Sequence, residues 1–257
     1  MLENKMRKKM AAGEPVFGMF VWSCSPDVVD ALGFTDLDFM IMDGEHSYID
    51  TEVMPAMLGA AKLHDITPVV RVKDYSRAAI LKMLDLGAEG IIVPDIHTLE
   101  EVEQIVRHAK YPDIGQRGMM IGRRAGYGCE KWYSSVEEYF EVSNRETLVF
   151  PMCETVDILE HVEEMAAMDG VDGVFVGPFD LSISLGIPGQ FQHPMFKAAL
   201  QRVVDACRKA NKFSAVYVGS TELAKERIAM GYQAVAVRTD IDVLIRGYRE
   251  ILKEVKS

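Results

Sequence analysis

The feature that most constrains the fold of this chain is an alternation of short apolar runs with segments of helical periodicity. Eight runs rich in β-branched and aromatic residues recur at residues 15–22, 38–43, 67–72, 90–94, 147–153, 173–176, 213–218 and 233–237. Runs of this length and composition predict buried strands. Because they are apolar almost throughout, they favour parallel strands that are covered by helices.

Helical patterns separate these runs. Apolar residues recur at three- and four-residue spacing within residues 76–86, 155–168, 194–209, 221–230 and 240–256. A further helix is expected to start at Thr98, where Glu101 completes a capping-box pattern, and to end near His108. Gly87 stands where the helix 76–86 needs its C-cap. Repeated strand–helix units predict an α/β protein with a single (β/α)8 TIM barrel. A doubly wound open sheet is the alternative, but no G-x-G-x-x-G follows the first run.

Size and composition agree with one domain over residues 1–257. Hydrophobic residues make up 49% of the chain, and no linker or low-complexity stretch divides it. No apolar stretch reaches the roughly 18 residues of a membrane span, so no membrane association is expected. The basic N-terminus is not followed by an apolar segment, so we expect no secretory signal.

Charge and cysteine usage restrict the partners and the compartment. The formal net charge is −11, with 39 acidic and 28 basic residues, which argues against nucleic acid as the main partner. The four cysteines show no CxxC pair and no zinc-ligand spacing, so they predict neither a disulfide framework nor a zinc site. We therefore expect a cytoplasmic protein. Cys153 lies within a predicted strand and is expected to be a core residue.

Two carboxylates stand at the ends of neighbouring predicted strands. Functional residues of such barrels lie at the carboxyl ends of the strands. Glu154 directly follows the run 147–153, and Asp180 follows the run 173–176 within the turn 177–180. Oxygen ligands of this kind suit Mg²⁺ or Mn²⁺. The alternative is that each carboxylate caps the helix or turn that follows it. Free backbone N–H groups of the 177–182 turn are also able to hold a small carboxylate.

Arg71, Asp43 and His46 add polar chemistry at two further strand ends. Arg71 interrupts an apolar run, where its guanidinium can offer a bidentate fork to a carboxylate or enolate oxygen. The alternative is an internal salt bridge with Asp43 or Glu45. Asp43 can orient one ring nitrogen of His46 for acid–base work, or His46 is a core histidine satisfied by its neighbours. The polar residues at all these strand ends are residues 22–25 and 43–46, Arg71, Lys73, Asp95, Glu154, Asp180, Arg238 and Asp240.

A long loop at residues 115–128 is rich in glycine and basic residues. It lacks the Lys-Ser/Thr ending of a nucleotide-binding P-loop. One interpretation is that it covers the site and presents Arg123 or Arg124 to an anionic acceptor. The alternative is a mobile surface segment or a subunit contact.

The motifs taken together resemble those of the HpcH/HpaI aldolase family, the metal-dependent pyruvate aldolases related to 2-dehydro-3-deoxyglucarate aldolase and 4-hydroxy-2-oxoheptanedioate aldolase. The similarity covers nearly the whole chain. The matching stretches are residues 42–46, 70–72, 84–94, 116–118, 124–125, 127–128, 154–155 and 171–182. The resemblance implies a (β/α)8 barrel of the phosphoenolpyruvate/pyruvate-binding type.

The resemblance also implies roles for individual residues. Glu154 and Asp180 would ligate a divalent cation such as Mg²⁺, Mn²⁺ or Co²⁺. Arg71 would stabilise the enolate oxygen of pyruvate, and His46, oriented by Asp43, would transfer a proton at the aldol hydroxyl. No Schiff-base lysine is needed, and Lys73 is the nearest candidate for one. The turn that would bind the substrate carboxylate consists of Gly177, Pro178, Phe179 and Asp180.

The implied function is reversible cleavage of a 4-hydroxy-2-oxo acid into pyruvate and an aldehyde. A related carbon–carbon lyase or decarboxylase, and a barrel that binds oxo-acids without turnover, are the alternatives. The family also implies a homo-oligomer, a hexamer built as a trimer of dimers, with the helix 240–256 packing on a neighbouring subunit. The chain departs from the family pattern at Met152, often Gln, at Phe179, commonly Ala, and around residues 238–240. These departures concern the choice of substrate more than the reaction class.

Overall fold

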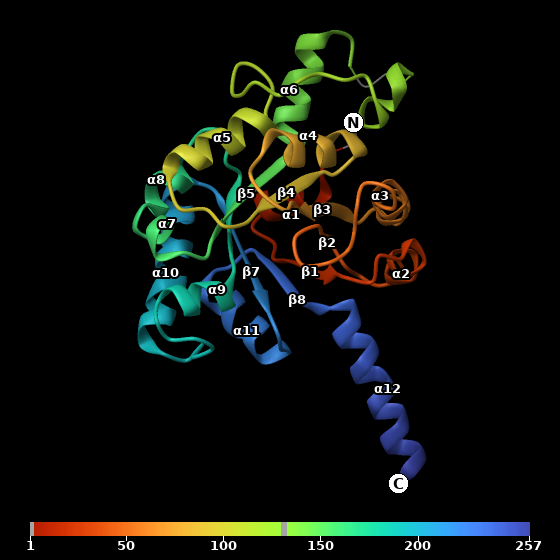
Figure 1. Cartoon of the computed structure of the whole chain (residues 1–257), viewed down its shortest axis with the longest axis vertical. Helices are drawn as coiled ribbons and strands as arrows, with labels where there is room; N and C mark the ends of the chain where they lie inside the picture. The colour runs from red at the N-terminus through yellow and green to blue at the C-terminus, as the bar shows by residue number, and fades with distance from the viewer. Residues whose placement is uncertain (1–2, 130–132) are drawn as a thin grey trace.

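Eight parallel strands close into a barrel in chain order, and helices surround it (Figure 1). The computed structural model describes residues 3–129 and 133–257. Each strand pairs with the next along the chain, and the eighth pairs with the first. The strands are β1 Val16–Val21, β2 Phe39–Asp43, β3 Thr67–Arg71, β4 Gly90–Val93, β5 Leu148–Cys153, β6 Gly173–Val176, β7 Phe213–Val218 and β8 Ala234–Thr239. Every apolar run forms one of these strands, so the prediction of a (β/α)8 barrel is confirmed.

Every predicted helix is present, one of them divided, and further helices form that were not predicted. They are α1 Lys5–Ala11, α2 Pro26–Leu32, α3 Met54–Leu63, α4 Arg77–Leu86, α5 Leu99–Ala109, the 3₁₀ helix η1 Arg123–Gly128, α6 Val136–Glu146, α7 Val156–Glu160, α8 Val162–Ala167, α9 Pro178–Ser184, α10 Pro194–Ala210, α11 Thr221–Met230 and α12 Asp240–Lys256. The expected helix 155–168 is divided at His161, whose φ of −111° and ψ of 18° are not helical. Thr98 and Glu101 form the predicted capping box, and Gly87 is the left-handed C-cap of α4.

The inside of the barrel is a packed core rather than a channel. Alternate strand residues point inward and form one buried cluster, which includes Ile41, Phe150, Met152 and Phe175. A second, larger cluster lies between the strands and the surrounding helices and contains Cys153, as expected of a core residue. The inward residues nearest the carboxyl ends of the strands therefore form the floor of any site on that rim.

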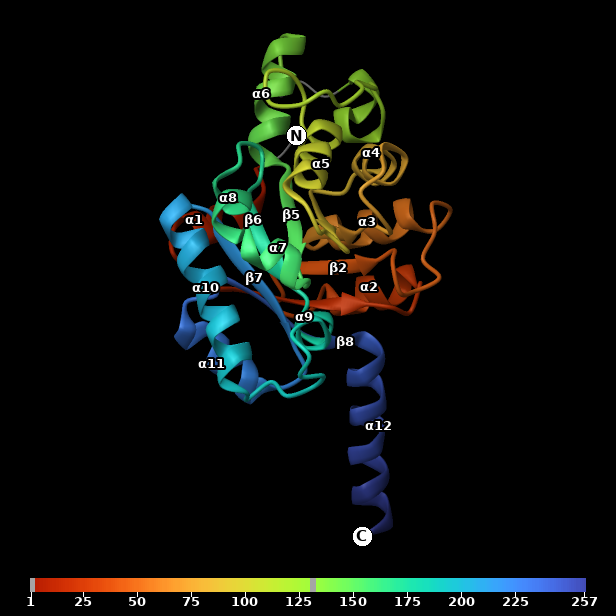
Figure 2. The same cartoon turned by 60° about the vertical axis from the view of Figure 1, so that its left-hand side comes forward.

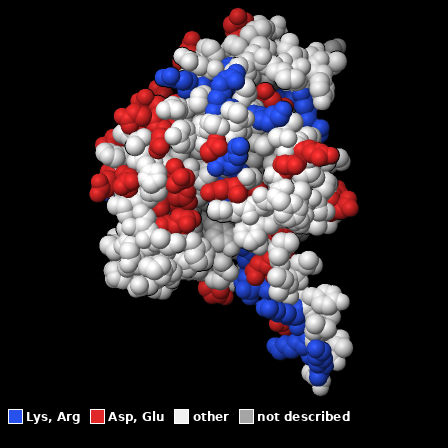
Figure 3. Space-filling view, in the orientation of Figure 1, with Lys and Arg blue, Asp and Glu red and all other residues white. Residues whose placement is uncertain are grey.

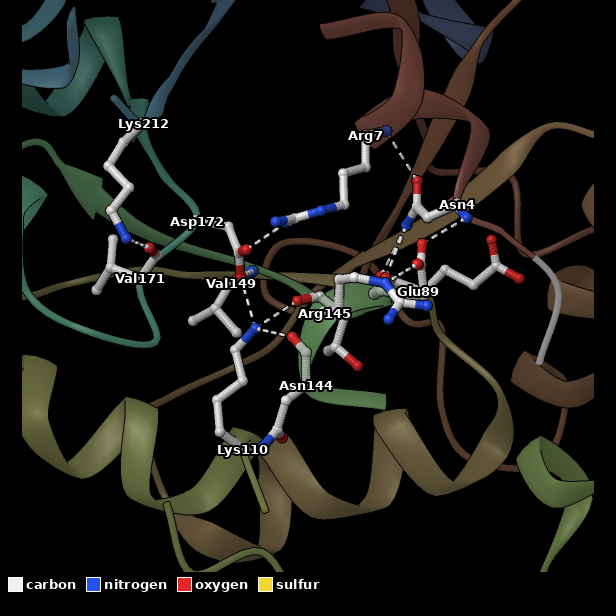
Figure 4. A network of polar contacts seen from close by, with 12 residues as sticks. Asn4, Arg7, Glu89, Lys110, Asn144, Arg145, Val149, Val171, Asp172 and Lys212 are labelled. Carbon is white, nitrogen blue, oxygen red and sulfur yellow. Dashed lines mark hydrogen bonds and ion pairs between the residues drawn. The ribbon is translucent and has the colours of Figure 1, made fainter. Parts of the chain in front are cut away.

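A buried polar network holds the opposite, amino-terminal end of the barrel (Figure 4). Asp172, just before β6, accepts hydrogen bonds from Lys110 Nζ at 2.7 Å and from Arg7 Nη1 at 2.6 Å. Lys110 also donates to the backbone oxygens of Asn144 and Thr147. Because both cations are paired and lie far from the catalytic rim of such barrels, the network stabilises the fold.

The glycine-rich loop 115–128 also belongs to this amino-terminal end. Arg124 is buried, donates to Thr147 Oγ1 at 2.6 Å and contacts the backbone oxygen of Ala88. Thr147 and Ala88 precede β5 and β4, at the ends of those strands that are opposite the rim. The part of the hypothesis that presents Arg124 to an acceptor in the site of its own chain is therefore wrong.

The C-terminal helix α12 extends away from the barrel, as both ribbon views show (Figure 1, Figure 2). It exposes a set of apolar side chains, namely Val243, Leu244, Ile245, Tyr248, Ile251, Leu252 and Val255. Lysines and arginines gather along another side of the same helix (Figure 3). No helix within the described residues is both long and apolar enough to cross a bilayer.

Candidate active site

A pocket of about 320 Å³ opens at the carboxyl ends of the strands. Its walls bring together residues from both ends of the sequence: Phe20, Trp22, His46, Arg71, Met152, Phe175, Gly177, Pro178, Phe179, Asp180, Tyr217 and Thr239. Six of the eight residues to which the sequence assigned a role line this pocket. A larger cavity, of about 770 Å³, is lined in part by Arg7, Lys110 and Asp172 of the amino-terminal network, and we do not regard it as the active site.

Glu154 is held in a tight, buried position behind the pocket wall. Glu154 is only 6% exposed, and its Oε1 accepts a hydrogen bond of 2.7 Å from the backbone N–H of Asp95. A Cβ atom at Gly177 would lie 2.2 Å from Oε2, so only glycine leaves room for this carboxylate. The N-cap of α7 is Thr155, not Glu154. The alternative that Glu154 serves as a helix cap is therefore wrong.

Asp180 stands in the first turn of α9 and is exposed to the pocket. The N-cap of α9 is Gly177, and no side chain caps this helix, so Asp180 is not a cap either. The pKa of Glu154 is raised to about 7, chiefly by burial and also by the charges of Asp180 and Glu45, while the Asp95 N–H and Arg71 oppose the shift. The three carboxylates thus share one electrostatic environment.

Arg71 is both a wall of the pocket and a member of a buried ion pair. Its Nε and Nη2 donate to the two oxygens of Asp43 at 2.9 and 2.6 Å, and Nη1 lies 3.1 Å from Glu45 Oε2. The guanidinium also stacks over Phe20, 4.9 Å from the ring centre. Burial opposes ionisation of Asp43, but the hydrogen bonds and charge of Arg71 hold the pKa of Asp43 below its ordinary value. The internal salt bridge holds the guanidinium of Arg71 at the pocket. The salt-bridge interpretation of Arg71 is therefore compatible with the interpretation that it faces a substrate oxygen.

The pairing of Asp43 with His46 differs from the expectation. Asp43 Oδ1 accepts from the backbone N–H groups of Glu45 and His46, at 3.1 and 3.2 Å, and Oδ2 accepts from Trp22 Nε1 at 2.8 Å. The ring of His46 is half exposed, and its Nε2 lies 3.6 Å from Glu45 Oε2. Asp43 thus shapes the loop that carries His46, while Glu45 is the carboxylate beside the imidazole. Asp43 does not pair with the ring of His46 because Arg71 and Trp22 already bond to the side-chain oxygens of Asp43.

The sequence did not reveal a hydrogen-bonded cluster of Asp95, His97 and Asp157 that joins the ends of β4 and β5, and that we call the clasp. His97 bonds to Asp157 through Nδ1 at 2.8 Å and to Asp95 through Nε2 at 3.2 Å. Asp95 has a φ of +56°, in the left-handed region that non-glycine residues seldom adopt. The hydrogen bond to Asp157, together with Asp95, raises the pKa of His97, although burial opposes this. His97 gave no signal in the sequence because its closer partner, Asp157, lies 60 residues away along the chain.

Several other polar residues at strand ends have no direct place in the pocket. Lys73 is exposed and does not line it. Asp240 accepts from the backbone N–H groups of Trp22 and Ser23, which fixes the end of β1. Arg238 donates to Asp242 at 2.6 Å. Phe20 and Tyr217, by contrast, do line the pocket, and the alternation of inward residues along β1 and β7 would have identified them.

The donor set fits a hard divalent cation. Within the described residues, no group of three or more His, Cys, Asp or Glu side chains is arranged to hold a metal ion. Mg²⁺ ordinarily takes one or two protein carboxylates and leaves its other positions to water or substrate. Glu154 is a buried carboxylate whose charged form is disfavoured by two acidic neighbours. A nearby cation would relieve that cost, so the residues are suitable for one.

Comparisons with known proteins identify the family. The model of the HpcH/HpaI aldolase/citrate lyase family matches residues 16–247. A hydroxypyruvate/pyruvate aldolase of Roseobacter denitrificans is 31% identical over 99% of this chain and 98% of its own. A 5-keto-4-deoxy-D-glucarate aldolase of Shigella dysenteriae is 32% identical over 93% of this chain and 92% of its own. A crystal structure of a family member from Burkholderia cenocepacia superposes with a TM-score of 0.91 at 29% identity, covering 99% of this chain and 100% of the other.

Fold, site and relatives together define a carbon–carbon lyase of the aldolase type, built on a (β/α)8 barrel. The chain belongs to the HpcH/HpaI aldolase/citrate lyase family.

Proposed function

We propose that this protein is a divalent-metal-dependent aldolase that cleaves a 4-hydroxy-2-oxo acid reversibly into pyruvate and an aldehyde. The observation that carries the proposal is that Asp180 and the fixed guanidinium of Arg71 line one rim pocket, and that the buried Glu154 carboxylate lies directly behind Gly177 of its wall. The relatives named as aldolases support the same reaction class.

Glu154 and Asp180 would hold Mg²⁺, Mn²⁺ or Co²⁺ at the pocket. When bound, such an ion supplies Lewis acidity toward a keto oxygen and neutralises charge that develops there. Gly177 contributes by its lack of a side chain, because any Cβ would displace the Glu154 carboxylate. The clasp of Asp95, His97 and Asp157 keeps the Asp95 N–H directed at Glu154.

The remaining residues bind the substrate and manage protons. The backbone N–H groups of Phe179 and Asp180 open α9 after Pro178, where helical N–H groups have no partner within the helix, and they are suited to the pyruvate carboxylate. Arg71 presents its guanidinium to the oxygen that becomes negative in the enolate. His46 is the proton carrier for the aldol hydroxyl, with Glu45 beside its ring.

The experiment that tests this function is pyruvate formation from a panel of 4-hydroxy-2-oxo acids, with and without a chelator. Pyruvate release that is lost on chelation and restored by Mg²⁺ or Mn²⁺ supports the aldolase. Deuterium exchange into pyruvate without cleavage of any panel member favours the related lyase or decarboxylase. Binding of oxo-acids with neither reaction favours a barrel without turnover.

We further infer that the protein is a homo-oligomer of one-domain barrels. The exposed apolar side of α12 supports packing of this helix on another copy, because a monomer would leave Leu244, Tyr248 and Ile251 in water. The hexameric trimer of dimers is the form that we expect. The cytoplasm remains the proposed compartment, since all four cysteines are free thiols.

A further inference from the structure

The half of the pocket beyond the carboxylates is walled mainly by aromatic rings. Asp180 and Gly177, with Glu154 behind the wall, mark the end that we assign to pyruvate. The other lining residues include Phe20, Trp22, Phe179 and Tyr217, beside His46, Arg71 and Thr239. The pocket volume of about 320 Å³ is at the small end of the range for ligand sites. With pyruvate bound, the remaining volume therefore suits one small aldehyde.

The rings of this second half are braced by further aromatic contacts. Phe179 packs edge-on against Phe191, with centroids 4.9 Å apart, and Phe191 contacts the buried Phe196. Tyr217 packs edge-on against Phe20 at 5.6 Å. Phe179 is nonetheless 56% exposed, so an apolar face remains for a ligand to cover.

The charges around the pocket disfavour a second carboxylate on the aldehyde. Asp180, Glu45 and Glu154 are acidic. Arg71, the one cation among the described residues that line the pocket, already has Asp43 and Glu45 as partners. Arg238 follows the same rim on β8 but is bonded to Asp242. A carboxylate entering this half would lose its hydration and meet no free cation within the described residues.

We propose that the acceptor is an aldehyde that carries an aromatic or branched apolar group and no second carboxylate, and that Phe179 and Tyr217 determine this specificity. The inference rests on the proposed aldolase function. In the synthetic direction, the methyl carbon of pyruvate loses a proton and bonds to the aldehyde carbon. One proton is delivered to the resulting alkoxide, so the product is a 4-hydroxy-2-oxo acid and nothing is oxidised or reduced.

The test compares benzaldehyde with succinic semialdehyde, an aldehyde of similar size that bears a carboxylate, as acceptors for pyruvate. We expect kcat/KM for benzaldehyde to exceed that for succinic semialdehyde by at least about tenfold in the full-length protein. In Phe179→Ala and Tyr217→Leu the ratio falls toward one, whereas Tyr217→Phe, which keeps the ring, retains it. Because each ratio compares the two aldehydes in the same variant, a general loss of activity does not alter it.

Deuterium exchange into the methyl group of pyruvate, measured without any aldehyde, tests the proposed aldolase function separately from the acceptor specificity. Exchange in the wild type with no preference for benzaldehyde overturns the inference and leaves the aldolase proposal standing. Absence of both exchange and cleavage overturns the two together. Preference for succinic semialdehyde also overturns the inference.

Discussion

The backbone N–H of Asp95 donates a hydrogen bond of 2.7 Å to Glu154 Oε1 and thereby ties the end of β4 to the end of β5. Asp95 adopts a left-handed conformation to make this contact, and the side chain of His97 holds it there. A carboxylate fixed by the backbone of a neighbouring strand is already oriented before a ligand arrives.

Replacing Gly177 by alanine tests whether this position is kept free for Glu154. A Cβ atom would stand 2.2 Å from Glu154 Oε2, so the carboxylate must move, and we expect the affinity for Mn²⁺ to fall at least about tenfold. Isothermal titration calorimetry measures the affinity. Gly219→Ala is the matched control, because a Cβ there has no neighbour within 4 Å. Equal affinities in the two variants would refute the steric argument.

The stability of the metal-free protein is expected to depend on pH through Glu154. Its pKa is raised from 4.5 to about 7, so between these values the folded state binds a proton that the unfolded state has lost. Stability therefore decreases as pH rises across this window, by about 3 kcal/mol for a shift of this size. Denaturant unfolding at pH 4.5 to 7.5 measures it. Glu154→Gln should flatten that part of the profile, and an unchanged slope would contradict the assignment.

Removing the His97 side chain tests the clasp. Surface ion pairs contribute at most about 1 kcal/mol, so His97→Ala should weaken Mn²⁺ binding by no more than about fivefold. Asp157→Asn should act in the same direction, since it removes the carboxylate charge that faces His97. Arg202→Ala, which breaks an exposed ion pair with Glu163 elsewhere, is the control and should not alter Mn²⁺ affinity. A similar loss of affinity in this control would show that the effect is not local.

Arg71→Lys is expected to reduce kcat/KM for cleavage by at least about a hundredfold. An ammonium cannot reproduce the two parallel hydrogen bonds to Asp43, so both the loop of His46 and the charge at the pocket are misplaced. Steady-state kinetics and a melting curve separate a loss of chemistry from a loss of fold. A variant with wild-type kcat/KM would remove Arg71 from the mechanism.

The apolar side of α12 provides a test of assembly. Leu244 and Ile251 are exposed in the single chain, so a glutamate at either position places a charge in the proposed subunit contact. We expect Leu244→Glu to shift the protein to a smaller species in sedimentation velocity. Lys253→Glu changes a highly exposed charged residue of the same helix and should leave the mass unaltered. If Leu244→Glu retained the wild-type mass, α12 would not be the contact.

The sequence predicted the barrel well because its signal is local and periodic. The composition of each apolar run indicates a buried strand. Thr98 marks a helix start by its capping side chain, and Gly87 marks a helix end by its left-handed backbone. The site was less accessible, because it depends on contacts between distant segments. Asp43 was expected to hold the ring of His46, but Arg71 from the next strand occupies its side-chain oxygens instead. Nothing near Arg124 in the sequence shows that its partner Thr147 lies at the far end of the barrel.

The most direct test of the account is a Mn²⁺ titration of the metal-free protein followed by electron paramagnetic resonance. The account predicts one bound ion per chain in the wild type, and a loss of at least about tenfold in affinity in both Glu154→Ala and Asp180→Ala. Wild-type affinity in either variant would show that these two carboxylates do not share an ion, and the proposed reaction would lose its physical basis.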